Sequence, residues 1–311
     1  MGKMRNDPTC AEEAAQLLSA VELSALSIVD SKRTRVRLLV YFGGLTACWF
    51  SVAALDASAV AAPIIVMLGV LYAHGLELQH ECLHGRMIES RRATRIVGIL
   101  LGAPMLVSYT HYRMMHFHHH KYLGTPNDRE LFDYDVASLK SWTAFGRRAW
   151  NLERLPRFVL DGVRMALGRY RPVFDSAESR RDVRNEYVFL TALLLGAVLW
   201  SLAYRSWLFV LAWFIPWLLI GEVTHFIIEL PEHLFCEKHM RDTFANTRTV
   251  LSSPLAEYLT NGNNYHVEHH LYPGVAIGNL RHVHRRIGSR VKHVSSSYWQ
   301  FYRRVLGSIG Q

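Results

Sequence analysis

Cysteine is scarce in this chain of 311 residues: there are four, and no two of them form a CxxC pair. The cysteines therefore offer no paired-thiolate metal site, and most of them are expected on the reducing side of a membrane. A cleaved signal peptide is not indicated either, because the segment up to Ser31 lacks a basic stretch ahead of an apolar one.

Charged residues are missing from four long stretches, at residues 38–55, 57–76, 187–204 and 206–221. A helix needs about 17 to 25 largely apolar residues to cross a bilayer, and the fourth stretch reaches that length only when it continues past Glu222. We therefore predict an all-α polytopic membrane protein with four transmembrane helices in two hairpins. Buried core helices of a soluble protein are the weaker alternative.

Basic residues gather on one side of these predicted spans. Four arginines follow the second span, ten lie from Arg147 to Arg184, and four basic residues precede the first span. The links at Asp56 and Arg205 carry one charge each. The positive-inside rule then predicts that both termini are cytoplasmic. Contact with anionic lipid head groups accounts for the net charge of +9, so no nucleic-acid partner is expected.

The predicted organisation has three parts that form one integrated domain. They are a cytoplasmic N-terminal helix (1–35), the membrane hairpins (36–230) with an intervening cytoplasmic segment (81–186), and a cytoplasmic C-terminal segment (231–311). Residues 96–109 are apolar but only 14 residues long, and they contain Gly102 and Pro104. We predict a re-entrant or interfacial segment there. The aromatic, basic run from Tyr298 to Arg304 is either a membrane-surface helix or packs against its own domain.

Histidine, in contrast, is abundant, with 17 residues, of which eight stand in three clusters. They are His80 and His84 in HECLH, His116, His119 and His120 in HFHHH, and His266, His269 and His270 in HVEHH. Residues at i, i+3 and i+4 share one face of a helix, so each cluster can aim its imidazoles at one point. Chance alone gives HxxHH about 0.05 times in such a chain. Eight imidazoles suit two metal ions, so we predict a cytoplasmic helical metal-binding region that caps the spans.

The number of histidines favours iron over zinc, because catalytic zinc usually has three protein ligands and an open position. Two irons could reduce O₂ and so attack an unactivated C–H bond. Four acids near the clusters are expected to accept imidazole N–H groups, or else are ordinary surface charges: Glu81, Asp128, Glu130 and Glu268. His118 points away from the HxxHH face and is left out of the predicted site.

The segments HECLHG, HFHHHKYLGTPNDRE and NYHVEHHLYPG, with Leu280 and His284 beyond them, resemble the membrane fatty acid desaturase superfamily, which includes carotenoid ketolases and hydroxylases. The likeness runs from about residue 70 to 290. It implies a four-span helical membrane protein with a cytoplasmic diiron centre, O₂ as co-substrate and the eight clustered histidines as ligands. It also implies an external electron donor, a ferredoxin or a cytochrome b5-type protein with its reductase, since no haem domain is visible.

The same resemblance implies a further histidine ligand between the fourth span and the last cluster. The candidates are His233 in ELPEHLFC, which we prefer, and His225 in GEVTHF, which could also pair with Glu229 or be structural. Asn264, just before the third cluster, is a candidate for positioning it.

The leading prediction is an O₂-dependent desaturase that acts on a fatty acyl or lipid substrate from the bilayer. A hydroxylase or ketolase of a carotenoid, alkane or sphingoid base would use the same oxidant, and desaturation of a small amino-acid-derived metabolite is a third possibility. A metal transporter is disfavoured, because transporters usually place ligands at mid-bilayer. The compact loops and the lack of an ER-retrieval ending favour a bacterial inner membrane, with the active site cytoplasmic.

Overall fold

The computed structural model describes residues 17–55, 58–128, 139–151, 153–170 and 176–310. Within these residues the chain is mostly helical, as predicted, and it separates into two compact units. The first, here called the span unit, contains residues 30–116 and 143–227. The second, here called the C-terminal unit, contains residues 1–29, 117–142 and 228–311.

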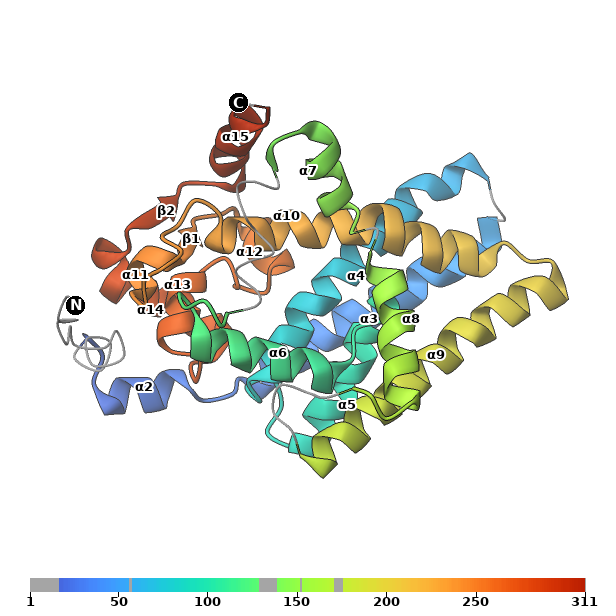
Figure 1. Ribbon diagram of the computed structural model, residues 1–311, viewed down its shortest axis with the longest axis horizontal. Coiled ribbons are helices and arrows are strands. Elements are labelled where there is room, and N and C mark those ends of the chain that lie inside the picture. The colour runs from blue at the N-terminus through green and yellow to red at the C-terminus, as the bar shows by residue number, and fades with distance from the viewer. Residues whose placement is uncertain (1–16, 56–57, 129–138, 152, 171–175, 311) are drawn as a thin grey trace. The chain divides into compact units, whose positions relative to one another are not determined.

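The span unit is built from long helices and short connecting ones (Figure 1). They are α3 (Ser31–Leu55), η1 (Ala59–Ala61), α4 (Ala62–Leu83), α5 (Arg91–Gly102), η2 (Ala103–Met105), the start of α6 (Tyr109–Tyr122), α7 (Trp142–Ala149), α8 (Arg154–Ala166), α9 (Ala177–Tyr204), the π-helical turns η5 (Val210–Phe214) and η6 (Pro216–Gly221), and the start of α10 (Glu222–His233).

Four helical segments among the described residues are long and apolar enough to cross a membrane, the number predicted from sequence. They are Ala20–Leu55, Ala59–Leu83, Ala177–Tyr204 and Val210–His233. The helices on either side of residues 106–108 meet at a bend of 95°, as in a broken span or a re-entrant loop. The bend falls within the predicted re-entrant segment. The pairing of the spans into hairpins and the side each end faces stay predictions.

A close approach of α4 to the fourth span determines the packing of the span unit. A Cβ atom on Gly69 would lie 2.4 Å from Cβ of Ile220 and 2.6 Å from the carbonyl oxygen of Pro216. Pro216 has no N–H to donate, and wide π-helical turns stand on both sides of Ile215. The backbone of the second π-helical turn packs directly on the glycine of α4.

The C-terminal unit combines short helices with a small sheet. Its elements are α2 (Ala20–Leu26), the ends of α6 and α10, α11 (Thr243–Asn246), β1 (Arg248–Val250), α12 (Pro254–Leu259), α13 (His266–Leu271), η7 (Ile277–Asn279), α14 (Leu280–Ile287), η8 (Gly288–Arg290), β2 (His293–Ser295) and α15 (Tyr298–Ser308). Strands β1 and β2 pair in parallel, with Thr249 opposite Val294. The all-α prediction missed this sheet, because strands of three residues are too short to show an alternating pattern.

The core of the C-terminal unit forms around the third histidine cluster. Tyr265 and Val267 pack with Leu280, Val283 and Ile287 of α14. The neighbouring helix α15 buries Phe301 and Val305 and leaves Trp299 exposed. The aromatic tail therefore packs against its own unit through one face.

Replacement of Gly69 by valine is expected to lower the stability of the span unit. The new side chain meets Ile220 and the backbone at Pro216, and over-packing of this kind costs about 1–3 kcal/mol. Gly43→Ala is the control, because Gly43 lies in α3 with nothing within 4 Å of a Cβ atom. Thermal unfolding in detergent measures both changes. Equal midpoints for Gly69→Val and wild type would contradict the packing described.

Candidate metal centre

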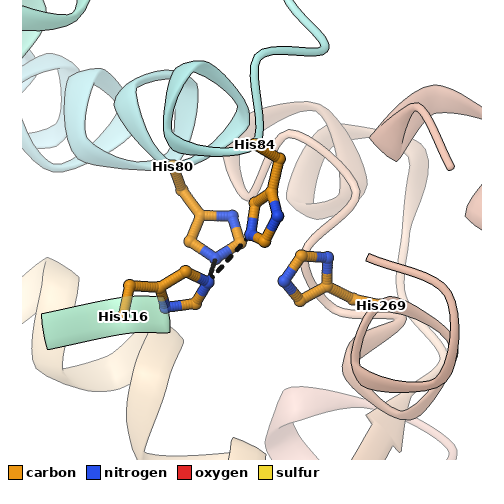
Figure 2. A group of neighbouring side chains, drawn as sticks. All are labelled: His80, His84, His116 and His269. Carbon is orange, nitrogen blue, oxygen red and sulfur yellow. Dashed lines mark hydrogen bonds between the residues drawn. The ribbon is translucent and has the colours of Figure 1, made fainter. Parts of the chain in front are cut away.

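Three histidines of the span unit converge where the end of α4 meets the middle of α6. His80 lies in the last turn of α4, His84 is its C-cap residue, and His116 lies on α6. Nε2 of His116 is 2.9 Å from Nε2 of His80 and 2.9 Å from Nε2 of His84. Figure 2 shows these three rings pointing their Nε2 atoms toward one another. We call them the histidine trio.

The trio depends on contacts between α6 and the end of α4. The last carbonyl groups of a helix have no partner within it. Here the Tyr109 hydroxyl donates to the carbonyl of Cys82, and Nε of Arg113 donates to the carbonyl of Leu83, at 3.0 and 2.9 Å. The end of α4 is therefore held against α6 by side chains one and two turns before His116.

Glu186 of α9 fixes the start of α6. Its buried carboxylate accepts from the backbone N–H of Thr110 at 2.8 Å and from the hydroxyl of Ser108 at 2.7 Å. Arg95 pairs with the same carboxylate at 3.1 Å. A negative charge at a helix N-terminus satisfies free N–H groups and complements the helix dipole. The orientation of α6, and so of its histidines, thus depends on this contact.

Four histidines of the C-terminal unit form a second group, here called the histidine quartet. Its members are His119 of α6, His233 of α10, and His266 and His270 of α13, and one ligand atom from each lies within 4.8 Å of the others. Nε2 of His270 is 3.3 Å from that of His119 and 3.1 Å from that of His266, which lies 3.3 Å from Nε2 of His233. His120 and His269 form a further pair at 3.1 Å.

Burial keeps His84 and His270 neutral. Burial, with the charges of Arg113 and Arg86, lowers the pKa of His84 to about 3. Burial and the neighbouring His120 and His266 hold the pKa of His270 well below its usual value. A neutral imidazole has a lone pair for a metal ion, whereas an imidazolium has none. These two rings are therefore in the form that binds metal at neutral pH.

Hydrogen bonds to Nδ1 orient two rings of the quartet. Nδ1 of His119 lies 3.0 Å from both oxygens of Asp128, and Nδ1 of His233 lies 3.1 Å from the carbonyl oxygen of Asn246. An N–H at Nδ1 leaves Nε2 as the metal-binding atom and fixes the angle of the ring. Asp128 thus has the position predicted for it.

A turn after α6 brings Asp128 back to His119. Gly124 has φ +74°, and a Cβ atom there would lie 1.8 Å from the carbonyl oxygen of Met240. Asn246 donates to the same carbonyl at 2.7 Å. Only glycine fits this approach, since a side chain would displace the turn and Asp128 with it.

The third cluster is held by β1 and the loop before it. Asn264 donates to the carbonyl of Val250 at 2.9 Å, in agreement with its predicted positioning role. Glu268 is fully buried and accepts from the hydroxyl of Thr249 at 2.6 Å. Its other oxygen lies 2.6 Å from Nδ1 of His284. Glu268 was predicted to contact a ligand histidine, but its described hydrogen-bond partners are Thr249 and His284 instead.

The remaining predicted residues have different places. His225 lies in neither the trio nor the quartet, and its Nδ1 is 3.6 Å from Oε1 of Glu77. His118 is buried with its ring 4.4 Å from that of Tyr122. Glu81 is buried on α4, and Glu130 lies outside the described residues.

Glu232 was not predicted, yet its Oε2 lies 3.2 Å from Nε2 of His266, on the side where the quartet converges. It directly precedes His233, as Glu268 directly precedes His269, and this adjacency is the sequence signal by which it could have been found.

The donor set fits metal ions with nitrogen ligands. The seven imidazoles of the trio and quartet are buried or half-buried. Within each group they turn Nε2 atoms toward one another at 2.9–3.3 Å, and one carboxylate lies beside the quartet. Iron, zinc and copper accept imidazole, and a dication satisfies several lone pairs at once. No thiolate belongs to either group. Such a set can hold a redox-active metal.

The chain is similar in sequence to known proteins. The family model described as Fatty acid desaturase matches residues 57–302. Dihydrorhizobitoxine desaturase of Bradyrhizobium elkanii is 29% identical over 68% of this chain and 64% of its own length. The sn-1 oleoyl-lipid 12-desaturase of Picosynechococcus sp. is 24% identical over 72% and 68%. The sn-1 acyl-lipid omega-3 desaturase (ferredoxin) of Synechocystis sp. is 24% identical over 86% and 78%. The chain thus spans under two thirds of the first relative's length.

Asp128→Asn is expected to weaken metal binding about 10- to 100-fold, because the carboxylate that orients His119 loses its charge. Competition with a chelator on the purified protein measures the affinity. Asp242→Asn is the matched control: Asp242 caps α11 in the same unit and contacts no histidine of the quartet. Equal affinities in the two variants would show that Asp128 does not support the metal.

His233 and His225 are expected to differ in metal content. His233→Ala removes a member of the quartet, so the purified protein should retain less metal per chain than wild type. His225→Ala removes only the partner of Glu77, so metal should be retained while thermal stability falls. Mass-spectrometric metal analysis decides between them, and metal loss confined to His225→Ala would reverse the assignment.

Proposed function

The chain belongs to the fatty acid desaturase family, and on this premise we propose that it is an O₂-dependent diiron desaturase that introduces a carbon–carbon double bond into the acyl chain of a lipid. The observation that carries the proposal is the convergence of imidazoles in two groups. Two relatives whose names specify lipid substrates support the substrate class.

The proposed ligands are the eight clustered histidines and His233. They are His80, His84, His116, His119, His120, His233, His266, His269 and His270. When bound, two iron ions supply the reduction of O₂ and an oxidant for unactivated C–H bonds. His225 is not included, because its described partner is Glu77.

The reaction balances with an external reductant. The substrate loses two hydrogen atoms from neighbouring carbons, which removes two electrons and two protons. A donor protein adds two electrons, and solvent adds two protons. O₂ receives all four electrons and four protons and leaves as two waters. We propose a ferredoxin, or a cytochrome b5-type protein with its reductase, as the donor, and one relative, the omega-3 desaturase of Synechocystis sp., is named for ferredoxin.

The chain's own residues prepare this chemistry. Asp128 and the carbonyl of Asn246 hold protons on Nδ1 of His119 and His233, so that Nε2 stays free on both rings. Burial of the quartet excludes water, which strengthens each electrostatic contact there. The carboxylate of Glu232 contributes negative charge beside His266.

Desaturation of a small metabolite is the second candidate, and the relative named for dihydrorhizobitoxine supports it. Ionisable side chains at membrane depth are costly and tend to be functional or paired. Glu77 and His225 are such a pair, and both are buried. A polar substrate group is compatible with polar side chains at this depth, whereas an acyl chain gains nothing from them.

We further propose that the protein is integral to a bacterial inner membrane, with the metal-binding ends of its helices and both termini in the cytoplasm. The excess of arginine near those ends supports this orientation.

Mass spectrometry of lipids and small metabolites from an expressing host tests the function. Wild type should yield a lipid product about two mass units lighter than a host acyl lipid, and His119→Ala should yield none while still inserting in the membrane. His118→Ala is the matched control, since its ring packs on Tyr122 and should leave turnover largely intact.

The other outcomes separate the alternatives. A lighter small metabolite with unchanged lipids would establish the second candidate. A gain of one oxygen atom would establish hydroxylation. Full turnover and full iron content in His119→Ala would overturn the proposed site.

A further inference from the structure

Helix α14 (Leu280–Ile287) follows the third histidine cluster and is divided into an apolar and a basic face. Its apolar residues Leu280, Val283 and Ile287 are fully buried. Its exposed side chains are Arg281, His282, Arg285 and Arg286, here called the basic face. The helix therefore turns every large apolar side chain inward and presents only polar groups to solvent.

The charges of the basic face are available to a partner. Arg286 pairs with Glu22 at 2.8 Å and Arg281 with Glu257 at 3.8 Å, and both arginines are 60% exposed. Exposed ion pairs contribute at most about 1 kcal/mol, so they exchange easily for other carboxylates. Arg285 forms no ion pair with any residue in the described part of the chain.

The basic face lies one helix away from the third cluster. His284, on the inward side of α14, has Nδ1 2.6 Å from Oε1 of Glu268, and its ring centroid lies 5.5 Å from that of Tyr265. Tyr265 directly precedes His266, and Glu268 directly precedes His269. The exposed arginines thus stand on a helix whose one inward imidazole contacts the residues that directly precede two proposed ligands.

We propose that the basic face of α14 is the docking surface for an acidic one-electron carrier protein, an inference that rests on the proposed function. Desaturation takes two electrons from outside the chain, and a carrier must bring its cofactor close to the metal to deliver them. Electron-transfer complexes are transient, have small interfaces and depend on charge complementarity. The basic face supplies the charge at the point where α14 contacts the third cluster.

The composition of the face favours a protein partner over a lipid surface. A helix that lies on a bilayer inserts an apolar face between the head groups. On α14 no large apolar side chain is exposed. Helix α8 of the span unit shows the contrasting pattern, with Val159, Leu160 and Val163 about half exposed beside arginines.

Binding of an acidic [2Fe–2S] ferredoxin to the full-length, iron-loaded protein in phosphatidylcholine nanodiscs tests the proposal. Arg281→Gln/Arg285→Gln should weaken the Kd on the order of tenfold at low salt and flatten its dependence on salt. Arg157→Gln/Arg164→Gln removes the same charge from α8 of the span unit and should change the Kd less than about twofold. Arg281→Lys/Arg285→Lys should retain binding.

Three results would overturn the proposed docking surface. They are an unchanged Kd for ferredoxin in the α14 glutamine variant, equally weakened ferredoxin binding in both glutamine variants, and a loss of ferredoxin binding seen only in discs that contain anionic lipid. The last would assign the arginines to head groups. The assay does not require turnover, so it separates the two proposals. Ferredoxin bound through α14 without any desaturated product contradicts only the proposed function. Turnover with unchanged binding contradicts only the docking surface.

Discussion

Imidazole nitrogens that face one another at 2.9–3.3 Å in a buried site cannot all carry protons. Two N–H groups at that distance repel, and two imidazolium ions repel more strongly. Burial lowers the pKa of His84 to about 3 and holds that of His270 well below its usual value, so these rings offer lone pairs that a cation can bind. A metal ion is such a cation, and the rest of the arrangement keeps the lone pairs available for it.

Several supports of the two histidine groups act on helix ends. Tyr109 and Arg113 hold the last carbonyl groups of α4, and the carboxylate of Glu186 accepts from the N–H of Thr110 in the first turn of α6. Asp128, returned by the turn at Gly124, orients His119 at the other end of α6. Helix ends have free donors and acceptors, so side-chain contacts there fix the direction of the helix and of the rings it carries.

The sequence contained enough to predict four apolar spans and to propose histidine ligands, because both leave local patterns. A span appears as a long stretch without charge, and HxxHH appears as helical spacing. The structure places His233 in the quartet and His225 in neither group, while the ligand roles of both stay predictions. Other features depend on contacts between distant segments: the β1–β2 pair, the approach of Glu232 to His266, and the bond between His284 and Glu268. Strands of three residues and single buried acids carry no periodic signal.

Metal analysis combined with X-ray absorption on the purified, full-length protein tests whether the two histidine groups hold iron. We expect two iron ions per chain, each with a first coordination shell of nitrogen and oxygen and no sulfur. Zinc in place of iron, a single ion per chain, or a sulfur ligand would contradict this expectation.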